Sequence, residues 1–172
     1  MSCEILNVLE IDDVNSYIAL QFKLDMLWRD PRLKFLNLKD NSFLNTLGQD
    51  EKNKIWVPEI VFYNTEKKDE SLNDMKSYIV IQREGDNEQT EMTSIHNGNI
   101  FNGEENSIVK KRVYDIKFLC NFNMEYYPFD IQTCYMQFKM KGNSGNFVNL
   151  KLGERIINSP KTSIKLKIQS IL

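Results

Sequence analysis

Hydrophobic and polar residues alternate along much of the chain with a period of two. In the segment VNSYIALQFKLDMLW (14–28), apolar side chains occupy every even position from Ile18 to Trp28, and polar ones mostly stand between them. The segments RVYDIKFLC (112–120) and CYMQFKM (134–140) alternate in the same way. Because successive side chains of a β-strand point to opposite faces, this pattern predicts three long strands, each with one apolar face.

Shorter segments with strand character lie between sequences that form turns. The turn signals include IDDVN, WRDPRL, HNGN and KGNSGN, which are rich in Asn, Asp, Gly and Pro. KDNSFLNTLGQ (39–49) predicts a short helical turn. Many short strands joined by turns favour an antiparallel β-sandwich. The shorter strands are predicted over residues 54–64, 76–84, 91–96, 99–101 and 146–152.

The last fifteen residues, NSPKTSIKLKIQSIL (158–172), differ in character from what precedes them. They alternate through Ile164, Leu166 and Ile168, so they are either one more strand or sequence foreign to the domain. The total of 172 residues suits one domain with a sizeable core, and no repeat or linker interrupts it.

Charge and hydropathy exclude several classes of function. The net charge is −2 and no run of Lys or Arg stands out, which argues against nucleic acid or an anionic membrane surface as a partner. No window approaches eighteen apolar residues, so no transmembrane helix is predicted. The N-terminal sequence MSCEILNVLEID lacks the zones of a signal peptide. A single histidine, no GxSxG, no Gly-rich phosphate loop and no clustered carboxylates make an enzyme improbable.

The three cysteines are Cys3, Cys120 and Cys134. The last two are separated by thirteen residues, which is wrong for a zinc knuckle or a CxxC redox pair. With one histidine, His96, neither a metal site nor a cofactor is expected. Both cysteines fall on the apolar faces of their predicted strands, so a bridge between neighbouring strands is geometrically reasonable. Such a bridge implies an oxidising compartment, in conflict with the missing signal peptide unless the N-terminus is incomplete.

Three motifs, taken together and in order, resemble the extracellular ligand-binding domain of the Cys-loop pentameric ligand-gated ion channels. The resemblance covers roughly residues 5–155. It implies an all-β, antiparallel immunoglobulin-like sandwich over residues 1–157 that lacks its final strands, with a divergent tail at 158–172. The motif residues are Trp28, Asp30 and Arg32 in WRDPRL; Trp56, Pro58 and Glu59 in WVPEIVFYN; and Cys120, Pro128, Phe129, Asp130, Gln132 and Cys134 in the loop between the cysteines.

The resemblance implies a receptor in which ligand binding between subunits of a homo- or hetero-pentamer opens a pore. It places the domain on the extracellular side of the plasma membrane, with the membrane reached through a transmembrane part outside this sequence. The disulfide-closed loop from Cys120 to Cys134 would contact the pore domain through an apolar tip; the alternative is that the tip packs on its own sandwich. The implied coupling residues are Tyr127, Pro128, Phe129 and Asp130 in this loop, and Asp12, Asp13 and Val14 in the turn between the first two strands.

The same resemblance assigns residues to a ligand pocket. On the principal face, Tyr63 falls on the first usual aromatic position, whereas Lys141 stands where a second aromatic is common. On the complementary strands the corresponding residues are Lys23, Asp25 and Lys111. The lysines favour an anionic ligand group, such as the carboxylate of an amino acid, over a quaternary amine. The alternative is that they are solvated lysines of a subunit without a working site, and that Tyr63 is a core or rim residue.

Three other identities stay open at this stage. One is a soluble, secreted ligand-binding homologue, and another is a truncated subunit that forms no channel. The third is an adhesion module that uses the disulfide only as a staple, although immunoglobulin-type bridges enclose many more residues than this one.

Overall fold

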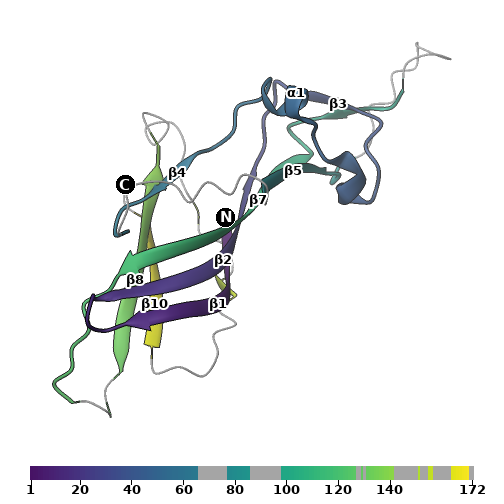
Figure 1. The fold of residues 1–172 in the computed structure, drawn as a ribbon. Helices are drawn as coiled ribbons and strands as arrows, with labels where there is room; N and C mark the ends of the chain where they lie inside the picture. The colour runs from purple at the N-terminus through teal and green to yellow at the C-terminus, as the bar shows by residue number, and fades with distance from the viewer. Residues whose placement is uncertain are drawn as a thin grey trace. The chain divides into compact units, whose positions relative to one another are not determined.

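The computed structural model describes residues 1–65, 77–85, 98–126, 129, 131–141, 151, 155–156 and 164–170 (Figure 1). Helix is limited there to a 3-10 turn, η1 (Ser42–Asn45), and to one turn of α-helix, α1 (Gln49–Lys52). The strands are β1 (Ser2–Asp12), β2 (Tyr17–Trp28), β3 (Lys34–Leu36), β4 (Ile60–Phe62), β5 (Ser77–Gln82), β6 (Ile100–Asn102), β7 (Ser107–Leu119), β8 (Gln132–Met140), β9 (Arg155–Ile156) and β10 (Ile164–Ser170). The all-β fold class and the short helical turn are confirmed.

The strands form three sheets. One has the order β5-β7-β2-β1-β9, one the order β10-β8-β4, and one pairs β3 with β6 (Figure 1). The pairs β4–β8, β5–β7 and β3–β6 are antiparallel, as the sequence predicts. The pairs β1–β9 and β8–β10 are parallel. Parallel pairing needs a long crossover, and the chain between Met140 and Ile164 is long enough to provide it.

The chain divides into two compact units. Unit 1 comprises Met1–Leu24, Pro58–Lys76 and Val113–Leu172, and unit 2 comprises Asp25–Val57 and Ser77–Arg112. The long strands β2 and β7 run through both. The predicted boundary after residue 157 stays a prediction; beyond it, β10 pairs in register along β8 from Ile164 to Ser170.

The core of unit 1 follows from the period-two pattern. The even residues of β2 from Ile18 to Leu24 are buried, and so are the even residues of β8 from Cys134 to Met140. Phe22 stacks on Tyr114 with ring centroids 5.3 Å apart, and Phe62 meets both rings edge-on. Aromatic pairs in these geometries add to the stabilisation from area burial alone, so the predicted apolar faces meet in one aromatic cluster.

Unit 2 has its own apolar cluster, built from Leu38, Ile79, Ile81, Phe101 and Ile108. Trp28 packs against this cluster and meets Trp56 edge-on at 6.3 Å. The predicted strand over 54–64 is therefore wrong in its first half, because Ile55 and Val57 pack on this cluster and only Ile60–Phe62 join a sheet. The predicted strand at 91–96 lies outside the described residues, and of the one predicted over 146–152 only Lys151 is described, where it belongs to no strand.

The Asp30 carboxylate organises the loop after β2 in unit 2. Arg32 donates to both of its oxygens, at 2.8 and 2.7 Å, and this pairing holds the pKa of Asp30 below its usual value. The backbone of Gly103 closes the same loop by bonding to Asp30 and Leu33. A Cβ added to Gly103 would stand 2.2 Å from the Asp30 carbonyl oxygen, so this close approach requires glycine.

Candidate functional site

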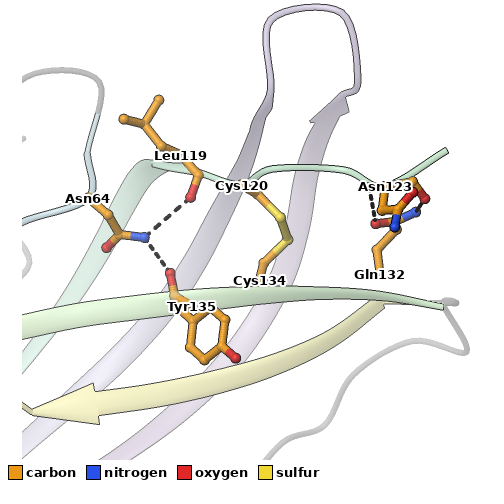
Figure 2. The surroundings of a disulfide bond; sticks show 7 residues. All are labelled: Asn64, Leu119, Cys120, Asn123, Gln132, Cys134 and Tyr135. Carbon is orange, nitrogen blue, oxygen red and sulfur yellow. Dashed lines mark hydrogen bonds between the residues drawn. A yellow bond between two sulfur atoms is a disulfide. The ribbon is translucent and has the colours of Figure 1, made fainter. Parts of the chain in front are cut away.

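The Cys120–Cys134 disulfide is formed, with the two Cα atoms 5.2 Å apart. The sequence made a bridge between neighbouring strands geometrically reasonable. Cys120 follows β7 of the five-stranded sheet and Cys134 lies on β8 of the three-stranded sheet, so the bridge connects two sheets (Figure 2). Within the closed loop, Asn123 and Gln132 bond reciprocally: Gln132 donates to the Asn123 carbonyl at 2.7 Å and accepts from its N–H at 3.0 Å.

The turn between β1 and β2 lies at the same end of unit 1 as the root of the cystine loop. Asp12 accepts two hydrogen bonds from Asn15, at 2.8 Å each, and these bonds lower the pKa of its carboxyl. The chain then passes through Ser16 in the left-handed region, at φ 56°, before β2 begins. The Ser16 carbonyl accepts a hydrogen bond from the Cys120 N–H at 2.9 Å. The structure thus connects the two segments that were predicted to couple to a pore.

The apolar side chains at this end point into solvent. Val14, at the tip of the turn, is 87% exposed, and Phe129, in the cystine loop, is 91% exposed. The alternative in which the loop tip packs on its own sandwich does not hold for Phe129. Tyr127, Pro128 and Asp130 lie outside the described residues, and Asp13 is exposed. Exposed apolar side chains of this size in two connected segments are typical of a contact surface.

A charged group beside the turn joins β1 to β7. Lys117 lies 3.2 Å from Glu10 and 4.1 Å from the centroid of the Tyr17 ring. Hydrogen bonds with Tyr17 and Glu10 raise the pKa of Lys117 to about 12, and the hydrogen bonds of Tyr17 and Lys117 lower the pKa of Glu10. Lys117 is therefore charged at any physiological pH and holds both neighbours.

The principal-face candidates Tyr63 and Lys141 both border the β4–β8 ladder but do not meet. The Tyr63 N–H bonds to the Gln137 carbonyl, and the Lys141 N–H bonds to the Glu59 carbonyl. These contacts are four residues apart along β8, or about 13 Å. The Lys141 ammonium pairs with the Glu59 carboxylate at 3.2 Å, where both side chains are half exposed.

Lys139, which sequence reasoning missed, is the cation that contacts Tyr63. Its ammonium lies 4.6 Å from the centroid of the ring, and the Tyr63 side chain is 43% exposed. Lys139 lies in the segment 134–140 whose alternation predicts a strand, only two residues before Lys141, which is a signal that the sequence did contain. Its proximity to Tyr63 depends on the register between β4 and β8.

The complementary candidates lie on other strands. Lys23 and Asp25 occupy the polar face of β2 and are partly buried. Lys111 stands opposite Tyr78 in the β5–β7 ladder, and its ammonium lies 5.6 Å from the Phe43 ring centroid. The resemblance places these residues on a face that another subunit would complete, so a single chain is not expected to bring them to Tyr63.

Asn64 is a second residue that sequence reasoning missed. Its side-chain amide donates to the carbonyls of Leu119 and Tyr135, at 3.3 and 2.5 Å, and accepts from the Gln137 N–H at 3.0 Å (Figure 2). The Asn64 carbonyl also accepts from the Leu119 N–H at 2.7 Å. This residue, which follows Tyr63 directly, therefore bonds next to both cysteines of the bridge.

Comparison with known proteins agrees with this geometry. The family model described as the neurotransmitter-gated ion-channel ligand binding domain matches residues 1–170. The chain is 25% identical over 134 residues to the neuronal acetylcholine receptor subunit alpha-2 of Gallus gallus, a match that covers 78% of this chain and 21% of that subunit. The chain thus spans about a fifth of the length of this relative. None of the helices in the described residues is long and apolar enough to cross a membrane.

The family is one of ligand-gated ion-channel receptors and not of enzymes. Its domains face the outside of the plasma membrane, bind neurotransmitters and assemble as oligomers, and the Cys120–Cys134 pair matches its cystine loop. A match over residues 1–170 of 172 shows the family, and this chain therefore belongs to the neurotransmitter-gated ion-channel ligand-binding domain family.

Proposed function

We propose that this chain forms the extracellular ligand-binding domain of a channel subunit and passes ligand binding to a pore through its cystine loop. The observation that carries the proposal is the hydrogen bond between the Cys120 N–H and the Ser16 carbonyl, which unites the loop with the β1–β2 turn. Val14 and Phe129 then present two exposed apolar side chains from one connected end. A connected pair of segments is suited to receive and transmit one displacement.

The coupling mechanism is allosteric. A ligand that binds better to one arrangement of the sandwich shifts the receptor towards that arrangement, by no more than its differential affinity. Tyr63 borders β8 opposite Gln137, which lies three residues beyond Cys134. A movement of the Tyr63 segment therefore has a short route along one strand to the cystine loop.

We infer that the ligand carries an anionic group such as a carboxylate. Lys139 stands over the Tyr63 ring, and Lys141 directly follows the last residue of β8. The relative in Gallus gallus is named for acetylcholine, which is a cation. A cationic ligand at the Tyr63 ring would meet the like charge of Lys139, whereas a carboxylate would be attracted to it. The complementary lysines Lys23 and Lys111 would add to this preference.

Electrophysiology on receptors assembled from subunits that carry this chain tests the proposal. Glutamate, glycine and γ-aminobutyrate are compared with acetylcholine at increasing concentration. We expect a current with a carboxylate ligand, and a half-maximal concentration at least tenfold higher for Lys139→Gln. Lys54→Gln, which removes an exposed lysine of unit 2, is the matched control and leaves the response unchanged.

Each other outcome of these recordings is decisive. If acetylcholine is the one ligand tested that gives a current, the anionic ligand is refuted, while the proposal that the chain belongs to a channel subunit stands. Ligand binding to the oxidised chain without current from any assembled receptor favours the soluble homologue. If the chain neither binds a ligand nor gives a current, the result favours a subunit without a working site.

A further inference from the structure

Asn64 lies where three strands approach one another in unit 1. It follows β4, and its side chain reaches Leu119 at the end of β7 and Tyr135 on β8 (Figure 2). Leu119 directly precedes Cys120, and Tyr135 directly follows Cys134. One side chain therefore bonds to the residues next to both cysteines, which are the two roots of the cystine loop.

The disulfide alone does not position the loop in this way. It fixes Cys120 and Cys134 relative to each other, but it makes no connection to the segment that carries Tyr63. The Tyr63–Gln137 backbone bond ties this segment to β8, and Asn64 extends the connection to both roots through three side-chain hydrogen bonds and one that its backbone carbonyl accepts from Leu119. The isolated bridge between Thr65 and Phe118 continues the contact by one residue.

The chemistry of the site requires a primary amide. Two carbonyl oxygens need N–H donors, and the Gln137 N–H needs an acceptor. Aspartate would retain the acceptor but would place a carboxylate against two carbonyl oxygens. Alanine would remove all three of these hydrogen bonds, so nothing at position 64 would tie Leu119 to Tyr135 and Gln137.

We propose that Asn64 is a positioning residue that holds both roots of the cystine loop to the Tyr63 segment, so that the two move as one body. The part of this inference that concerns channel gating rests on the function proposed above. The part that concerns the loop does not, because it is a statement about this chain alone.

The first test uses the full oxidised chain and the rate at which a thiol reduces the disulfide. Cys120 and Cys134 are 3% and 1% exposed, so reduction requires the loop roots to open. We expect Asn64→Ala to speed reduction about tenfold and to speed amide hydrogen exchange at Gln137. Asn64→Asp keeps the oxygen acceptor for the Gln137 N–H, so it should speed reduction while the Gln137 amide stays protected from exchange. This variant also keeps the test possible if Asn64→Ala does not fold.

Asn45 offers a matched control in unit 2. Its amide donates to the carbonyls of Lys39 and Ile81 and accepts from the Lys39 N–H. Like Asn64, it therefore donates two hydrogen bonds to carbonyls and accepts one from a backbone N–H. Asn45→Ala should lower overall stability similarly and leave the rate of disulfide reduction unchanged. Equal reduction rates for Asn64→Ala and the unaltered chain, or equal acceleration by Asn45→Ala, would overturn the proposal.

The second test is the response of an assembled receptor. We expect Asn64→Asp to lower the maximal current of a saturating ligand while ligand affinity, measured by displacement, changes less than threefold. Unchanged currents alongside faster reduction would overturn the role in gating and leave the proposed function intact. If the unaltered receptor gives no current with any ligand, the proposed function fails, while the reduction experiment still decides whether Asn64 holds the loop.

Discussion

Removal of the Cys120–Cys134 bridge should cost the chain more stability than removal of the buried free thiol of Cys3. The bridged cysteines have a sequence separation of 14. Closing a loop of that length lowers the entropy of the unfolded chain by an amount worth about 3 kcal/mol. Both sulfurs are also buried, so replacement by alanine adds on the order of 1 kcal/mol for lost packing. We expect the double variant Cys120→Ala/Cys134→Ala to lose about 4 kcal/mol of unfolding free energy.

Urea unfolding of the full chain, followed by circular dichroism, measures this loss. For a slope of about 2 kcal/mol per molar urea, the midpoint should fall by about 2 M. Cys3→Ala is the matched control, because Cys3 is buried and makes no disulfide. That variant loses packing without a change in loop entropy, so its midpoint should fall by about 0.5 M. Equal losses for the two variants would refute the attribution to loop closure.

Two further predictions concern single ionisable groups. Arg32 holds the pKa of Asp30 below its usual value, so the stabilisation is present above about pH 4 and is lost as the pH falls through the folded pKa. The difference in unfolding free energy between the unaltered chain and Asp30→Asn should shrink as the pH falls from 7 through the folded pKa. A difference that stays constant down to pH 2 would contradict the ion pair. Burial raises the pKa of Cys3 to about 12, so iodoacetamide should alkylate this thiol at pH 8 only after unfolding. Alkylation of the native chain at the rate of an exposed thiol would contradict its burial.

The sequence predicts most of what depends on local pattern. Alternation identifies the buried faces of β2 and β8, because a strand that packs on one side must place apolar residues at every second position. The segment 39–49 also predicts the helical turn at η1, where the Asn41 side chain accepts a hydrogen bond from the Phe43 N–H. The cystine loop was recognised from Cys120 and Cys134 together with motifs elsewhere in the chain.

The alternation of apolar and polar residues does not predict which strands pair or in which register. The contact of Lys139 with Tyr63 exists because Val61 pairs with Lys139, and alternation carries no information on register. The sequence made a bridge between neighbouring strands reasonable, but apolar position alone does not tell that the Cys120–Cys134 bridge connects two sheets. Asn64 is the last residue of the strand predicted over 54–64, and its role appears only once β7 and β8 stand beside it.

The cystine-loop region and the proposed ligand site also differ in whether one chain or two would supply their residues. The loop roots, the β1–β2 turn and Asn64 belong to unit 1 of one chain, so hydrogen bonds within the chain fix their geometry. The ligand site that we propose between subunits would have no such internal bonds across it, and the partner subunit would supply Lys23 or Lys111. Binding energy at that interface can therefore change with assembly, whereas the connection from Tyr63 through Asn64 to the cystine loop is present in every copy. It follows that variants of Asn64 and variants of the lysines should affect different quantities, the efficacy of a ligand in the first case and its affinity in the second.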